Sequence, residues 1–132
     1  MSARGQSLLE LALALPVLLL LALGAVDLTR LAVARSGLDA ASAASAAAAA
    51  RAPDARHAGQ AGATAFRGVA TAYRLEEPGF VVTVGSFQRG GTVSVRAQTH
   101  VSLGLIGVPG LRPVWDLQST AVARIEDWRS RP

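Results

Sequence analysis

The sequence contains no cysteine and no lysine, and only 5% of its residues are aromatic. The lack of cysteine excludes a disulfide framework, a thiolate metal site, a catalytic thiol and a lipid anchor on cysteine. All positive charge comes from 13 arginines, which are spread along the chain with acidic residues between them. The net charge of +4 therefore indicates a mixed, solvated surface rather than a phosphate-binding patch, and we expect no nucleic-acid partner.

Residue patterns that carry chemistry are also missing from the sequence. The two histidines, His57 and His100, are isolated and far apart, so they do not have the spacing of metal ligands. There is no glycine-rich phosphate loop, and no serine lies in a nucleophile elbow. We predict no catalytic residue, metal or cofactor, no small-molecule substrate and no enzymatic activity.

One long apolar stretch, residues 8–26, dominates the sequence. As a helix it would extend for about 28 Å, close to the roughly 30 Å of bilayer hydrocarbon. Glu10 is the only charged residue between Arg4 and Asp27. The chain is therefore expected to be exported or tethered to a membrane, with the remaining hundred or so residues forming one small unit.

Three interpretations of this segment are open. A secretory signal peptide is compatible with Arg4 and with the small residues Ala22 and Gly24, although the apolar run is long and a carboxylate has no use there. A plain single-pass anchor has little reason to carry Glu10, because an acid at the bilayer centre costs about 2.5–3.5 kcal/mol. In the third interpretation a peptidase cuts after Gly5. Gln6 then carries a new α-amino group that can pair with the carboxylate four residues later, in the same or a neighbouring subunit.

The run RGQSLLELALALPVLLLLALGAVDLTRLAVA resembles the start of TadE-like pseudopilins, minor components of Flp (tight adherence) pili. The resemblance implies that Gly5 precedes the cleavage point, Gln6 is the first mature residue, Glu10 is the signature acid that sets subunit register, and Pro16 is the helix proline, which we expect to kink the helix. Leu11 stands where the family often has an aromatic residue. The implied partners are a prepilin peptidase, the major Flp pilin and other pseudopilins, an inner-membrane assembly platform and the lipid bilayer.

The remaining sequence predicts an α+β fold. Helical character continues from the apolar stretch until Pro53, and Asp54 can cap a second, shorter helix that extends to about residue 74. Two alternating segments follow, and a two-residue turn at Gly90 and Gly91 would pair Phe80 with Val101. A third alternating segment from residue 115 completes a small antiparallel sheet of about three strands. The expected organisation is a leader peptide (1–5), a transmembrane helix that continues as an extracytoplasmic helix (6–52), a small extracytoplasmic α+β domain (53–127) and a tail (128–132).

Two segments have alternative interpretations. The alanine-rich tract at residues 40–50 either brings helices close together, in a filament core or against the chain's own domain, or forms a solvent-exposed helix. The apolar loop at residues 104–113 either folds over the core or contacts lipid headgroups or a partner.

As a whole, the sequence predicts a minor pseudopilin that takes part in assembly, initiation or anchoring of a Flp-type pilus. It would cross the cytoplasmic membrane once, with its N-terminus in the cytoplasm, and could enter the pilus. The alternative is a secreted or membrane-anchored extracytoplasmic binding module without a role in a pilus.

Overall fold

The computed structural model describes residues 2–104 and 113–126. The chain forms a long helix, α1 (Ala3–Ala50), a second helix, α2 (Ala55–Ala72), and three strands, β1 (Glu76–Val84), β2 (Thr92–Ser102) and β3 (Val114–Arg124). The strands form one antiparallel sheet in the order β1-β2-β3. The α+β fold predicted from the sequence is confirmed.

Helix α1 is continuous because alanine and leucine, both strong helix formers, supply most of its residues. It ends at Ala50, shortly before Pro53. The N–H of the capping residue, Arg51, still bonds to the carbonyls of Ala47 and Ala48. Asp54 caps α2 as predicted, with its side chain accepting the backbone N–H of His57 at 2.9 Å. That bond lowers the pKa of the Asp54 carboxyl below its ordinary value, with a further contribution from the side chain of His57.

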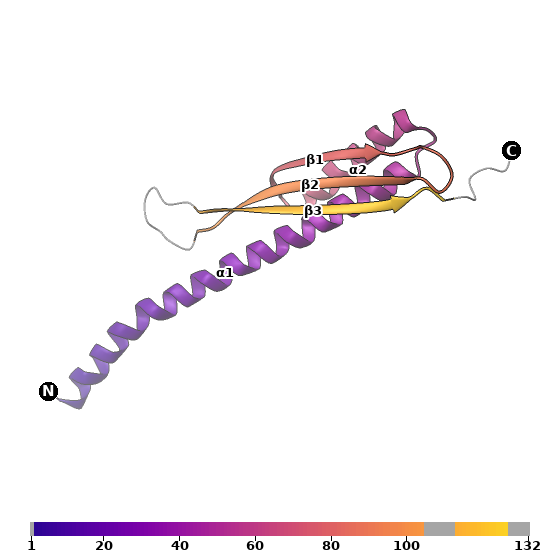
Figure 1. Cartoon of the computed structure of the whole chain (residues 1–132). Coiled ribbons are helices and arrows are strands. Elements are labelled where there is room, and N and C mark those ends of the chain that lie inside the picture. The colour runs from indigo at the N-terminus through magenta and orange to yellow at the C-terminus, as the bar shows by residue number, and fades with distance from the viewer. Residues whose placement is uncertain (1, 105–112, 127–132) are drawn as a thin grey trace.

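The two helices cover one face of the sheet, and the first half of α1 projects away from it (Figure 1). The core between the layers is built mainly from small residues. Phe66 is its largest fully buried side chain, and its ring stacks on that of Phe80 with 4.3 Å between centroids. Two clusters of buried residues form the core: Leu38, Ala41, Phe66, Ala70, Ala97, Val101 and Leu117 in one, and Ala49, Ala50, Ala52, Ala58, Val93 and Ile125 in the other.

The alanine-rich tract packs against the chain's own domain. Ala41, Ala46 and Ala49 are buried at its interface with α2 and the sheet. The interpretation of this tract as a solvent-exposed helix is therefore wrong. Small side chains let the backbones of α1 and α2 approach closely, and the contact of Gly62 with Ser45 shows how little space remains between the helices.

The predicted register of the first hairpin is wrong by four residues. Phe80 pairs with Ala97 rather than with Val101. The two glycines cannot form the tight turn because they pair with the end of the third strand: Gly90 donates to the Ile125 carbonyl, and Ile125 donates to that of Gly91. Residues 85–91 make the connection instead. Because the difference is an even number of residues, the alternating apolar residues of both strands still share the inward face of the sheet.

The third strand is present where the sequence predicted it, and Leu117 and Ile125 are buried as expected of its apolar face. Trp115 belongs to the same face by alternation, yet 55% of its surface is exposed. The loop prediction for residues 104–113 and the tail at 128–132 fall almost wholly outside the described residues.

Candidate functional site: the exposed arm of α1 and its junction with the domain

The first half of α1 has no share in the core. Residues 2–26, here called the arm, are all exposed except Gly24, which is half-buried. Leucine side chains such as Leu13 and Leu20 extend outward with no packing partner from the domain. By length and composition α1 is suited to cross a membrane, and none of its most apolar stretch is buried. A row of leucines on all sides of a helix is stable only in an apolar environment.

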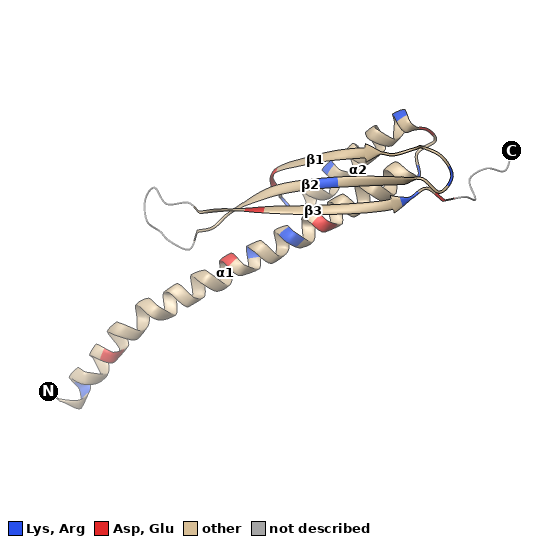
Figure 2. Ribbon diagram, in the orientation of Figure 1, with Lys and Arg blue, Asp and Glu red and all other residues tan. Residues whose placement is uncertain are grey.

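The residues predicted to form the processing and register site lie at the outer end of the arm. Gly5 and Gln6 are both exposed, and their backbone N–H groups donate to the carbonyl of Ser2 at 2.9 and 3.2 Å. Glu10 lies one turn further along and is also exposed. Glu10 is the only charged residue between Arg4 and Asp27, and Figure 2 shows few charged residues on the projecting part of α1. Residues 6 and 10 therefore lie on one helical face, as a pairing between them requires.

Pro16 lies inside α1. Proline has no N–H to donate to the carbonyl of Ala12, so one bond of the helical ladder is missing there. The helix nevertheless continues through this position with a gentle curve (Figure 1). The kink remains a prediction.

Asp27, which in the sequence is only the charge that follows the apolar stretch, lies at the junction where the arm meets the domain. Its side chain is buried, and Oδ1 accepts the backbone N–H of Gly104 at 3.2 Å. Arg30 Nη1 lies 4.0 Å from the same oxygen. Oδ2 is also buried, without a partner among the residues that the structure describes. The bond to Gly104 joins the end of the β2 segment to the base of the arm, a contact between residues 77 positions apart that only the fold could reveal.

Beyond the junction, a polar network attaches α1 to the sheet. Arg35 donates to Asp39, four residues further along the helix, at 3.2 Å, and also to the backbone carbonyl of Gln118 at 3.1 Å. Ser119 donates to Asp39 at 2.6 Å and shares a buried hydrogen bond with Ser42 at 3.0 Å. These bonds fix the position of the helix on β3 and satisfy the buried hydroxyls of Ser42 and Ser119, whereas the buried hydroxyl of Ser45 has no partner among the described residues.

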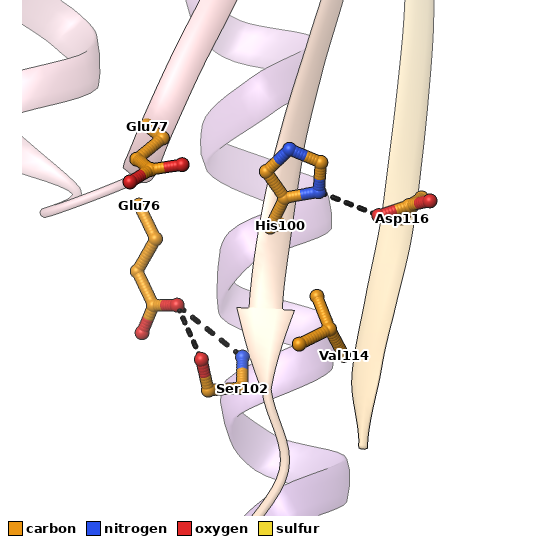
Figure 3. A pocket seen from close by; sticks show the side chains of 6 residues that line it. All are labelled: Glu76, Glu77, His100, Ser102, Val114 and Asp116. Carbon is orange, nitrogen blue, oxygen red and sulfur yellow. Dashed lines mark hydrogen bonds and ion pairs between the residues drawn. The ribbon is translucent and has the colours of Figure 1, made fainter. Parts of the chain in front are cut away.

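The sheet carries a second group of ionisable residues near the same end of the domain (Figure 3). His100 bonds to Asp116 through Nδ1, and the Glu76 carboxylate accepts the N–H and the hydroxyl of Ser102 at 3.3 and 2.9 Å. Glu77 completes the lining of this open pocket. Among the described residues no cluster of three or more acidic or histidine side chains has the arrangement of a metal site.

Comparison with known protein families gives a match to helix α1, which carries the arm and Asp27. The family model described as TadE-like protein matches residues 5–51. The first helix is similar to that of TadE-like proteins. The match begins at Gly5 and ends at the residue that caps α1, so it covers most of the arm and the half of α1 that packs on the sheet. Neither the curated proteins nor the solved structures provide a match to the chain. The α2 and sheet portions thus have no counterpart in these comparisons.

The TadE-like match associates the chain with the Tad/Flp pilus and with partners of pilus assembly in general. It agrees with a structural rather than a catalytic role. The resemblance to TadE-like proteins, which was predicted from the segment that contains Glu10 and Pro16, is confirmed by the family match.

Proposed function

We propose that the chain is a minor pseudopilin of a Flp-type pilus that takes part in its assembly, initiation or anchoring. The observation that carries this proposal is an apolar arm that the domain leaves fully exposed, with one carboxylate near its end, inside a TadE-like segment. The arm would hold the protein in the cytoplasmic membrane with its N-terminus in the cytoplasm and the domain outside. Extraction from the bilayer would then let the same leucine surface pack against other pilin helices.

Glu10 gives this association a register. Cleavage after Gly5 would convert the Gln6 amide nitrogen into an α-amino group, which is charged near neutral pH. A carboxylate within hydrocarbon is stabilised by such a charge, whether from the same chain or from a neighbouring subunit. Subunits that place the two charges together are favoured over those that slide along the uniform leucine surface. Processing would also remove Arg4, the positive charge that precedes the arm.

The partners that follow from this role are a prepilin peptidase, the major pilin, other pseudopilins and the inner-membrane assembly platform. The support for each is the TadE-like match together with the exposed arm. The domain would remain outside the membrane in contact with these proteins.

The intact mass of the protein purified from membranes tests the processing step. Loss of residues 1–5 is the result expected of a pseudopilin. Loss of residues 1–24 would instead indicate a secreted protein, and retention of the whole N-terminus would indicate a plain anchor. Either of these two outcomes would contradict the proposal.

A matched pair of arm variants tests the register. Glu10→Gln keeps the size of the side chain and removes its charge, so we expect membrane insertion to persist while incorporation into pili is lost. Glu10→Ala should behave in the same way. Leu9→Ala, at the neighbouring exposed position, should leave both properties intact. Normal piliation with Glu10→Gln would eliminate the role of the carboxylate.

A further inference from the structure

Outside the arm, exposed large apolar side chains gather at one end of the domain. Leu28 follows Asp27 directly, and Val114 and Trp115 begin β3 at positions paired with the end of β2. Val33 and Tyr73 line a groove of about 560 Å³ at this end, together with Arg30, Arg74 and Ser102. Among the described residues only Val81 and Val122 are large, apolar and exposed elsewhere in the domain. This end, called the junction end below, therefore carries most of the large, exposed apolar side chains of the domain surface that the structure describes.

The junction end lies at the level where the arm leaves the domain. Gly104 donates to Asp27 at 3.2 Å, so the end of the β2 segment reaches the base of the arm. Leu103 donates to the carbonyl of Pro113 at 2.9 Å, which places the start of the β3 segment beside it. Trp115 pairs with Val101, three residues before Gly104, so it lies about 10 Å along the strand from the base of the arm. A headgroup layer is roughly 5–8 Å deep on each side of the hydrocarbon, so the large side chain of Trp115 would lie at the outer edge of a bilayer around the arm.

The side chains at the junction end have the chemistry of a membrane interface. Tryptophan and tyrosine combine an apolar ring with a polar group and are enriched at the level of the headgroups. Arginine extends an apolar stem and a charged group toward phosphate. Acidic residues, Glu76, Glu77 and Asp116, lie at the same end, so the surface has no strong excess of positive charge. Contact through rings and aliphatic groups is therefore favoured over electrostatic attraction to anionic lipid.

We propose that the junction end of the domain, with Trp115 as its principal contact, rests in the headgroup layer of the bilayer that holds the arm. This proposal depends on the membrane-anchored arm of the proposed function. Its occupant is a lipid surface rather than a protein, because the exposed Leu28 lies at the base of the apolar arm, directly after the buried Asp27. The contact would restrict the tilt of the domain on its helix, so that a pilin partner approaches it from a limited range of directions.

Fluorescence quenching in vesicles tests the proposal with the full chain. Trp128→Phe leaves Trp115 as the single tryptophan in a protein reconstituted into phosphatidylcholine vesicles. Nitroxide groups placed on the headgroup or deep on the acyl chain then report its depth. We expect a large loss of Trp115 emission with the headgroup nitroxide and a much smaller loss with the deep one. We expect this quenching in zwitterionic phosphatidylcholine without added anionic lipid, because the contact depends on rings and aliphatic groups.

Two reporters in a Trp115→Phe, Trp128→Phe background serve as controls. Val122→Trp places the ring at an exposed position seven residues further along β3, about 24 Å away, and should not be quenched by either lipid. Leu19→Trp places it in the arm and should be quenched by the deep nitroxide.

The outcomes separate the two proposals. Quenching of the Leu19 reporter without quenching of Trp115 would overturn the headgroup contact and leave the membrane anchor intact. Equal quenching of Trp115 and the Val122 reporter would also overturn it, because the contact would not be specific to the junction end. No quenching of the Leu19 reporter would contradict the anchored arm itself, and with it the proposed function.

Discussion

The two halves of α1 share one helix but have opposite surroundings. In the arm, 60% of the surface of Leu20 is exposed, whereas Leu38, eighteen residues further along, is completely buried. The arm carries bulky leucines whose side chains are exposed and do not pack against the domain. The half that packs on the domain, residues 27–50, uses alanine, serine and glycine, which let α2 and the sheet come close. Apolar composition alone therefore does not make a core, because the size and arrangement of the side chains decide whether the partner lies inside or outside the chain.

The same substitution in each half should have very different effects. Leu38→Ala leaves a cavity in the core and should lower the free energy of unfolding of the domain by about 2–5 kcal/mol. Leu20→Ala removes a side chain with no partner in the domain and should leave that free energy unchanged. Urea titration of the full chain in detergent micelles measures both. Equal losses would contradict the division of α1 into an arm and a packed half.

Close packing of the second half predicts a cost for added bulk. A Cβ on Gly37 would lie 2.6 Å from Cγ of Tyr73, at the stem of the ring, where the side chain has little freedom to move away. Gly37→Ala should destabilise the domain by about 1–3 kcal/mol. Gly68→Ala is the matched control in α2, where a Cβ meets nothing within 4 Å, and should stabilise the domain by about 0.5–1 kcal/mol. Thermal unfolding measures both changes in stability. A midpoint that falls for Gly37→Ala and rises for Gly68→Ala would support close packing at Gly37, and a rise for both would contradict it.

A pair of serines sharpens the comparison further. The hydroxyls of Ser42 and Ser7 each lie within hydrogen-bond distance of the carbonyl four residues before them, at 2.9 and 3.1 Å, but only Ser42 can also donate to Ser119 across the interface. Ser42→Ala should lower the stability of the domain by about 1 kcal/mol, because a buried hydrogen bond is lost. Ser7→Ala should have no effect on it. A double mutant with Ser119→Ala that is more stable than the sum of the two single losses predicts would support the shared bond, whereas strictly additive losses would contradict it.

The smallest expected effect concerns pH and the start of α2. Folding lowers the pKa of the exposed Asp54, chiefly through the backbone N–H of His57. A carboxyl whose pKa is lowered on folding stabilises the fold above its unfolded pKa, and that contribution disappears as the pH falls through the folded value. Stability should therefore decline slightly below about pH 4, the ordinary range of aspartate. Asp54→Asn can still cap the helix but should remove this part of the pH dependence. If urea titrations show the same loss of stability at acid pH in Asp54→Asn as in the unmodified chain, the pH dependence does not come from Asp54.

The fold class was predictable because its signals are local. A proline ends the first helix and an aspartate caps the second, and both act within one turn of the chain. Alternation along β2 places Val93 and Val95 on the buried face in any register that differs by an even number of residues. The pairing itself was not predictable from the Gly90 and Gly91 pair, because a third segment, at Ile125, competes for those glycines.

The candidate site shows the same division. The run containing Gly5, Gln6, Glu10 and Pro16 is continuous in sequence, so its family resemblance could be recognised directly. Asp27 and Trp115 could not be placed, because their surroundings depend on a strand pair that reaches the base of the arm. In the sequence, Asp27 is distinguished only as the first charged residue after the apolar stretch.

By itself the sequence determined that an uninterrupted apolar helix precedes a small α+β domain, since helix propensity, capping and alternation depend on neighbouring residues. Only the tertiary structure decided which half of that helix is buried, how β1 and β2 align, and which residues meet at Asp27. These outcomes depend on shape complementarity between segments far apart in the chain, such as Gly37 with Tyr73 and Asp27 with Gly104. Several pairings satisfy the local pattern equally well, and only the packing of the whole domain selects among them.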